Sequence, residues 1–280
     1  MKINISIIKK AFGILFVLMA LGCQDMDTPP LGDYPVDENP PGGPLKFYVP
    51  FDDNTTDPLK FAVDNIRAKF PSDNPFTQID GISGKGAQGP ADHTKKYIAY
   101  SKPNDFAATA KSFTISFWEK HNGPTKSAEI IFGLPSTNGH WTGGAMLLLF
   151  ESPNVNATAV KFIIVDKNMA DTWLTWEGAN SIPGLVDNQW HHCVFVYDET
   201  TSGLTFYKDG VAISTKTWGT HGPVNLDDSK VGGFRLGSGP GPGPNDPWTG
   251  NSWLGGLDQF RMYSSALTTA EVTALYTGKE

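Results

Sequence analysis

The sequence has few cysteines and no excess of basic residues. Its 280 residues include only Cys23 and Cys193, which excludes the disulfide framework that stabilises many small secreted domains. Lysine and arginine number 22 against 29 acidic residues, and the formal net charge is −7. An acidic chain without a basic cluster repels phosphate backbones, so nucleic acid is excluded as a partner.

Residues 1–22 predict a cleaved targeting segment. Three lysines precede an apolar run at 11–21, which is too short to span a bilayer. The segment ends in ALGC, residues 20–23, which resembles the bacterial lipoprotein signal, although that signal favours leucine where Ala20 stands. The resemblance implies that Cys23 is lipidated and anchors the chain to a membrane. An ordinary cleaved signal followed by a chance cysteine is the alternative.

The residues after Cys23 predict surface display and a tether. Acidic residues at 25 and 27 resemble the export signal of Bacteroidetes-type surface lipoproteins, which implies exposure on the outer membrane. Loss of residues 1–22 removes three lysines and no acid, so the charge moves from −7 to −10. Residues 24–44 hold six prolines and five acidic residues, a composition typical of flexible tethers. We therefore expect a signal at 1–22, a tether at 23–44 and one domain at 45–280.

From residue 45 onward, short apolar runs alternate with turn residues, a pattern typical of all-β domains. No long amphipathic helix separates these runs. We expect twelve strands, at 45–51, 97–100, 113–119, 129–134, 145–150, 160–165, 172–177, 190–197, 204–208, 211–217, 233–237 and 254–263.

Two local motifs support this interpretation. Asp209-Gly210 joins two alternating runs and is a strong hairpin motif. Near the C-terminus, Thr268 and Glu271 have the spacing of a helix capping box, with Leu267 and Val272 placed as a hydrophobic staple. A short helix is therefore expected to close the chain, at about residues 269–276.

Several segments together resemble the laminin-G-like branch of the concanavalin A-like lectin/glucanase superfamily. The resemblance implies an all-β jelly-roll sandwich of two curved antiparallel sheets, a fold shared by lectins, adhesion modules and glycosidase-associated domains. Fold alone therefore does not settle function. The segments are FYVPFDDNTTD (47–57), GISGKGAQGP (81–90), SFTISFWEK (112–120), NQWHHCVFVYDETTSGLTFYKDGVAIS (188–214), GFRLGS (233–238) and WLGGLDQFRMYSSALTTAEVTALY (253–276).

Catalytic motifs are missing from these segments. Family-16-like hydrolases of this superfamily use Glu-x-Asp-x-x-Glu, and no glutamate here begins that motif. Asp171 and Glu177 share a strand face, but six residues at about 3.3 Å each place them too far apart for a catalytic pair. We expect no enzyme activity. A glycoside hydrolase with atypical carboxylates, contributed by different strands, stays an alternative.

The resemblance also implies a possible structural calcium ion. Related lectins hold Ca²⁺ between the first and last strands, with an aspartate from the last. The matching positions are Asp52 or Asp53 and Asp258. Backbone carbonyls and waters would complete the six to eight oxygen ligands that calcium needs. Alternatively, Asp258 accepts backbone hydrogen bonds.

Sugar binding depends on exposed aromatic faces, and three of the eight tryptophans are candidates. The alternation in 171–177 places Trp173 on a polar, wet face and Trp176 in the core. Trp141 lies in a glycine-flanked loop, and Trp248 lies in a proline-rich stretch. Each of the three has a plain alternative as a lid over the sandwich. Trp118 and Trp190 lie in motifs shared across the family and are expected to be structural.

The stretch GPGPGPNDPW (239–248) is an inserted loop. Glycine recurs at every second residue, which excludes collagen, and predicted strands flank both sides. Alternating glycine and proline limits the loop's freedom, so it could present Asn245, Asp246 and Trp248 to a ligand. The leading hypothesis is binding of polysaccharide or oligosaccharide at the cell surface, near other glycan-uptake proteins. A protein-adhesion module is the alternative.

Overall fold

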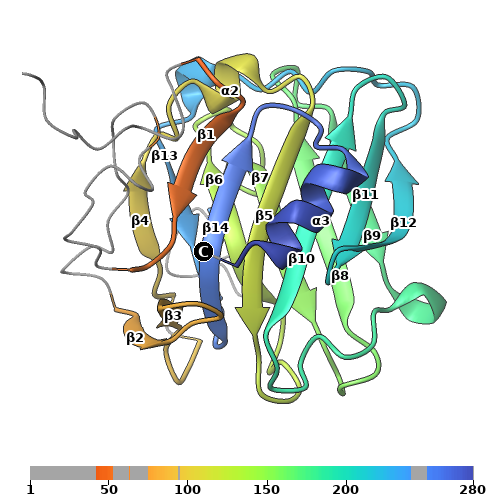
Figure 1. The fold of residues 1–280 in the computed structure, drawn as a ribbon. Coiled ribbons are helices and arrows are strands. Elements are labelled where there is room, and N and C mark those ends of the chain that lie inside the picture. The colour runs from red at the N-terminus through yellow and green to blue at the C-terminus, as the bar shows by residue number, and fades with distance from the viewer. Residues whose placement is uncertain (1–41, 53–62, 64–74, 94, 241–250, 280) are drawn as a thin grey trace, which may run out of the picture. The chain divides into compact units, whose positions relative to one another are not determined.

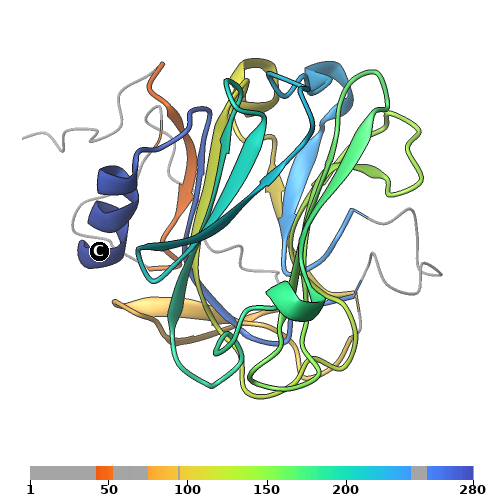
Figure 2. The same ribbon diagram turned by 90° about the vertical axis from the view of Figure 1, so that its right-hand side faces the viewer.

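Two antiparallel sheets pack face to face (Figures 1 and 2). The computed structural model describes residues 42–52, 63, 75–93, 95–240 and 251–279. The eight-stranded sheet has the order β12-β11-β10-β5-β14-β3-β2, with β1 paired to β14. Its strands are β1 (Leu45–Val49), β2 (Thr77–Asp80), β3 (Lys85–Gln88), β5 (Phe113–Lys120), β10 (His191–Asp198), β11 (Gly203–Lys208), β12 (Val211–Thr217) and β14 (Gly256–Tyr263).

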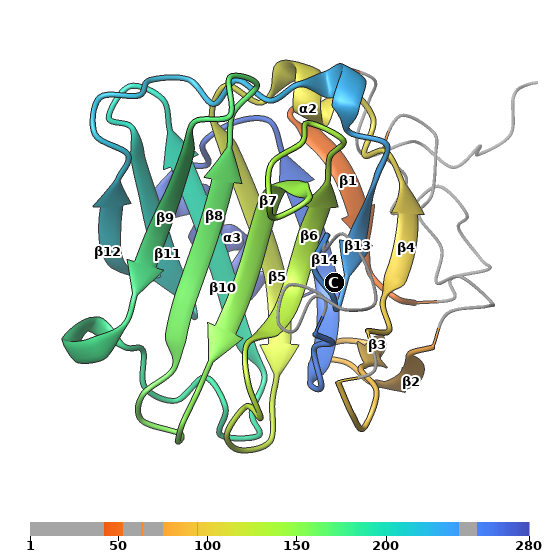
Figure 3. The same cartoon turned by 180° about the vertical axis from the view of Figure 1, so that it is seen from behind.

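The six-stranded sheet has the order β4-β13-β6-β7-β8-β9. Figure 3 shows the molecule with this sheet toward the viewer. Its strands are β4 (Ile98–Ser101), β6 (Glu129–Pro135), β7 (Gly144–Glu151), β8 (Ala159–Val165), β9 (Asp171–Trp176) and β13 (Gly233–Leu236). The all-β sandwich and the twelve expected strands are confirmed, with bounds shifted by one or two residues in most cases.

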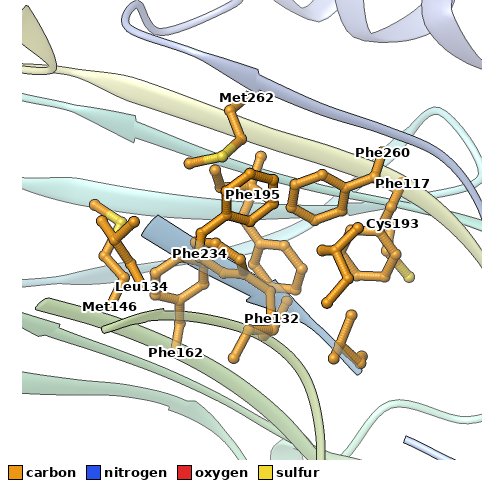
Figure 4. Close-up of a cluster of buried hydrophobic side chains, with 14 of the residues drawn as sticks. Phe117, Phe132, Leu134, Met146, Phe162, Cys193, Phe195, Phe234, Phe260 and Met262 are labelled. Carbon is orange, nitrogen blue, oxygen red and sulfur yellow. The ribbon is translucent and has the colours of Figure 1, made fainter. Parts of the chain in front are cut away.

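The core lies between the sheets and is rich in aromatic rings (Figure 4). Alternation along β5 turns Phe113, Ile115 and Phe117 inward, and all three are fully buried. Phe117 packs against Phe195 and Phe260 from neighbouring strands, with ring centroids 6.3 and 6.1 Å away. Burial of this apolar area is the main stabilising contribution to the sandwich.

The expected hairpin and C-terminal helix are confirmed. Asp209 and Gly210 both have positive φ, 52° and 78°, as a two-residue turn between twisted strands requires. Helix α3 (Thr269–Thr277) begins with the expected capping box of Thr268 and Glu271 and lies on the outer face of the eight-stranded sheet (Figure 2). The shorter helices are α2 (Phe106–Thr109), η1 (Gly178–Asn180) and η2 (Asp228–Lys230).

Strands β2 and β3 are the elements that the sequence pattern did not predict. Each has four residues, and β2 has no buried residue. They therefore lack the apolar alternation on which strand prediction depends. They form a hairpin that joins the sheet through two pairs, Gly256↔Gln88 and Leu257↔Ala87.

Two findings in the described residues concern membrane spans and Cys193. The described part of the chain contains no helix long and apolar enough to cross a membrane. Cys193 is a free, buried cysteine, as its strand pattern indicated.

Other expectations lie outside the described residues. They are the signal at 1–22, lipidation of Cys23, most of the tether, and the site residues Asp53, Asn245, Asp246 and Trp248.

Candidate functional site

Strand β9 places its two tryptophans on opposite faces of the six-stranded sheet. Trp176 is fully buried in the core, where its Nε1 donates a hydrogen bond to Ser214 Oγ at 2.8 Å. Trp173 faces outward and is 39% exposed. The period-two interpretation of this strand is therefore confirmed for the packing of both rings.

The connection between β6 and β7 brings a second tryptophan to Trp173. His140 contributes to the order of this connection, because its Nδ1 is hydrogen-bonded to Thr142 Oγ1 at 2.8 Å, and its Nε2 lies 3.6 Å from Asp171 Oδ2 at the start of β9. The backbone N–H of His140 also donates to Asn138 Oδ1 at 3.0 Å. The next residue, Trp141, is 53% exposed. The β6–β7 connection thus extends past β8 and contacts the edge strand β9.

The two rings lie nearly parallel. Their centroids are 6.1 Å apart and their planes differ by 12°. We call Trp141 and Trp173 the aromatic platform. Lys161 and Asp171 lie on the same outward face of β8 and β9 and supply charged, hydrogen-bonding groups nearby. An indole face covers the C–H face of a pyranose while such polar groups fix its hydroxyls, so this arrangement suits a sugar.

Two carboxylates also meet on this face. Glu151 and Glu177 lie 2.6 and 3.3 Å from the Nζ atom of Lys161. Since one ammonium contacts both, the carboxyl groups are no farther apart than the roughly 9.5 Å found in glycosidases. However, the ammonium occupies the space between them, where a glycosidic bond would have to lie. The sequence analysis did not find this pair because it depends on the register of β7, β8 and β9.

The described end of the proline-rich loop lies on the same face as the platform. Pro240 packs on Gly133 so closely that a Cβ atom there would lie 2.8 Å from the proline ring. Gly133 pairs with Leu147, Leu147 with Ile163, and Ile163 with Trp173. Directly paired residues share a sheet face, so Pro240 and Trp173 lie on one face, three strands apart.

The aspartates expected to bind calcium meet at the β2–β3 turn. Asp258 Oδ2 accepts a hydrogen bond from the backbone N–H of Ile82 at 2.8 Å, and Asp52 Oδ1 accepts one from Lys85 at 2.5 Å. Gly84 has a φ of +58° and lies against the Asp52 carboxylate, where a Cβ would clash. Burial raises the pKa of Asp258 to about 8, and the charge of Asp52 adds to this, whereas backbone N–H donors oppose it.

Both described aspartates accept backbone N–H groups at this turn. The oxygens of Asp258 accept N–H groups from Ile82 and Gln259, and calcium would need six to eight oxygens. Within the described ranges, no group of three or more His, Cys, Asp or Glu side chains could hold a metal. The hydrogen bond from Ile82 to Asp258 links β14 to the β2–β3 turn, which is the contact that the alternative interpretation described. Calcium binding at Asp52, Asp53 and Asp258 stays a prediction.

The tryptophan and histidines of the shared motifs are structural. Trp118 and His192 are buried on the outer face of the eight-stranded sheet, with ring centroids 5.0 Å apart. His191 has separate surroundings, between Asp209 at 2.8 Å and Asp187 at 3.0 Å. The two histidines therefore do not share a metal, as their adjacent positions on a strand indicated.

Sequence reasoning missed a polar cavity of about 500 Å³ where β5 ends. Its polar lining includes Gln88, Lys120, Asn122 and Asn188, together with Asp80. Gln88, Lys120 and Asn188 lie in three of the segments that carry the family resemblance, but nothing in those segments indicated that they line one cavity. Only the folded structure brings them together.

The comparisons with known proteins agree with this fold. A model of the family described as "Concanavalin A-like lectin/glucanases superfamily" matches residues 92–273, more than half of the chain. No curated protein matches the sequence.

Solved structures resemble the chain at low sequence identity. The binding domain of Paraclostridial Mosquitocidal Protein 1 has a TM-score of 0.51 and 14% identity, over 84% of this chain and 52% of that one. Domain 4 of AbnA, an arabinanase from Geobacillus stearothermophilus in complex with arabinotriose, has a TM-score of 0.42 and 20% identity, over 72% and 81%. A SAP-like pentraxin from Limulus polyphemus has values of 0.43 and 15%, over 60% and 70%. At these identities, the likeness concerns the fold.

Proposed function

Because the chain belongs to the concanavalin A-like lectin/glucanase superfamily, we propose that it is a non-catalytic carbohydrate-binding protein. In this proposal the aromatic platform contacts the C–H faces of sugar rings. The observation that carries the proposal is the close, nearly parallel and partly exposed placement of Trp141 and Trp173 on one sheet face.

The free energy lost by leaving aromatic rings exposed to water supports the assignment of binding to the platform. Burial of apolar surface stabilises a protein by about 25 cal/mol per Å², and tryptophan has the largest side chain to bury. A single exposed apolar side chain needs no explanation, but a contiguous exposed patch indicates a binding surface. His140 and Asp171 hold the loop that carries Trp141, so the patch is organised before a ligand arrives.

The polar groups around the platform complete the proposed site. Lys161 donates from a strand position whose neighbour on β9 is Thr175, one step along the outward face from Trp173. Its pKa is raised, because the hydrogen bond and charge of Glu151, with Glu177, outweigh the opposing effect of burial. Lys161 therefore stays a cationic donor at neutral pH, suited to sugar hydroxyls or to an anionic substituent.

We further propose that Cys23 carries a lipid and that residues 23–44 hold the domain away from the outer membrane. Surface display would keep a captured polysaccharide close to other glycan-uptake proteins. Asn245, Asp246 and Trp248 are included as proposed contacts from the loop that follows Pro240.

The experiment is a polysaccharide screen with the chain from residue 42 onward, which contains every described strand. Affinity electrophoresis through gels that contain neutral or acidic polysaccharides should show retarded migration in at least one gel. A folded protein that no polysaccharide retards would overturn the proposal. The folded state is checked by its thermal transition.

A further inference from the structure

The polar cavity lies at the opposite end of the sandwich from the aromatic platform. Strand β5 ends at Lys120, and β6 then runs back from Glu129 to Pro135. The connection at 121–128 and the platform's connection at 136–143 therefore lie at opposite ends. Figure 1 shows β2 and β3 at the end where β5 finishes. A ligand in this cavity would not touch the platform.

Two asparagines are held in place on one wall by backbone contacts. The backbone N–H of Asn188 donates to the carbonyl of His121 at 2.9 Å, and Asn122 pairs with Asp187 as an isolated bridge. Asn188 has a φ of +67°, a left-handed conformation that asparagine tolerates better than most residues. The two asparagines thus line the cavity from a connected backbone.

Gln88 forms part of the opposite wall in a fixed orientation. Its Nε2 donates to the carbonyls of Leu254 at 2.7 Å and Gly89 at 3.3 Å. Both amide hydrogens are therefore used within the protein, which leaves Oε1 as an acceptor for a ligand. The lining therefore combines two asparagines with a glutamine whose Nε2 is already used, a set of groups that suits hydroxyls.

The cavity also carries one cation without an internal partner. Lys120 forms no ion pair with any residue in the part of the chain that the structure describes. The other charged lining residue, Asp80, is paired with Lys85 Nζ at 2.8 Å. The local charge therefore favours an anion, although the chain as a whole carries −7.

We propose that this cavity binds a uronic acid residue, a sugar that carries a carboxylate. Lys120 pairs with the carboxylate, the carboxamides of Asn122 and Asn188 bind ring hydroxyls, and Gln88 Oε1 accepts from a hydroxyl. A volume of about 500 Å³ lies in the range of roughly 300–1,000 Å³ typical of small-molecule sites. The site is independent of the platform and does not rest on its function.

The test measures binding of trigalacturonate by calorimetry to a protein in which the platform is removed by W141A and W173A. Within this background, Lys120→Gln should weaken binding about tenfold, because it removes a charge-assisted hydrogen bond. Asn188→Gly removes the second carboxamide without straining the positive φ and should weaken binding about threefold. Lys111→Gln, at an exposed position outside the cavity, loses the same charge and should leave the affinity unchanged.

The neutral galactan trisaccharide separates the carboxylate from the hydroxyl contacts. It should bind more weakly than trigalacturonate, with an affinity that Asn188→Gly lowers and Lys120→Gln does not. The proposal is overturned if the folded background protein does not bind trigalacturonate, or if Lys120→Gln and Lys111→Gln have equal effects. If the platform binds no ligand, these results do not change, because the background protein lacks the platform. The two proposals can therefore be overturned independently.

Discussion

Two groups of aromatic rings lie on the outer faces of the two sheets, and their environments differ. On the eight-stranded sheet, Trp118 stacks with Tyr276 of helix α3 at 5.6 Å and packs against the tilted ring of His192 at 5.0 Å. Trp118 is only 1% exposed. On the six-stranded sheet, Trp141 and Trp173 stack at 6.1 Å and are 53% and 39% exposed.

The difference shows that an outward strand position does not by itself indicate a binding role. The outward faces of both sheets carry a tryptophan, and the covering element decides what each tryptophan does. Where helix α3 covers the ring, burial contributes to folding. On the six-stranded sheet, which α3 does not cover, the two rings keep 53% and 39% of their surface exposed. We therefore expect Trp118 to contribute to stability, and we propose the platform as the recognition surface.

The largest expected effect is on stability, at the covered group. Trp118→Ala should lower the free energy of unfolding by about 3–5 kcal/mol, because it removes a fully buried ring and leaves a cavity beneath α3. Urea denaturation measures this change. A loss below about 1 kcal/mol would show that α3 does not depend on the ring and would break the comparison.

The next effect is a pH dependence of stability that we expect from His192, which packs against Trp118. Burial, with the charge of Arg261, lowers the pKa of His192 to about 3, against the opposing charge of Asp209. Between about pH 6.5 and pH 3, the unfolded state binds a proton that the folded state does not. The contribution of His192 to stability therefore falls as pH falls, by up to about 1.4 kcal/mol per pH unit.

His192→Gln removes this titration while it keeps a polar side chain near Ser116. The difference in unfolding free energy between wild type and variant should shrink as the pH is lowered from 7 to 4. Parallel stability curves for the two proteins across this range would contradict the assignment.

A smaller effect is expected from the loop that follows Pro240. Trp248→Ala should weaken polysaccharide binding about fivefold, or roughly 1 kcal/mol, because the described end of this loop lies on the platform's face. The thermal transition should not change. Unchanged affinity would mean that the loop only covers the sheet and that recognition belongs to Trp141 and Trp173.

The smallest effect concerns the positioning of the platform. His140→Ala removes the contact with Asp171, frees the loop that carries Trp141, and should weaken binding about threefold through the cost of ordering it again. Binding calorimetry and a thermal melt check affinity and stability together. An affinity equal to that of wild type would show that the loop is ordered without this contact.

Local patterns predicted most of the fold because their causes are local. Alternation placed Trp173 outward and Trp176 inward, and the capping box predicted where α3 begins. The β2–β3 hairpin depends instead on Asp258, which contacts Ile82 across 176 residues of sequence, so no local pattern indicated it. Glu119 shows a second limit: it is fully buried, which raises the pKa of its carboxyl, although its charge argues for exposure.

The candidate site was predictable only residue by residue. Loop position identified Trp141 as a candidate, and strand alternation identified Trp173 separately. Their stacking requires the 136–143 loop to reach the edge strand, where His140 lies 3.6 Å from Asp171, and this approach cannot be deduced from spacing. The walls of the polar cavity come from segments spread between residues 79 and 255, which explains why sequence reasoning missed them.

The most direct test compares W141A/W173A with W141F/W173F on a polysaccharide that retards the wild-type protein. The alanine double variant should lose at least about tenfold in affinity, because tryptophans at the centre of a binding surface carry much of its free energy. The phenylalanine double variant keeps both aromatic faces and should retain most of the binding, and both should melt close to wild type. Equal binding by the alanine variant and the wild type would contradict the assignment of recognition to the platform.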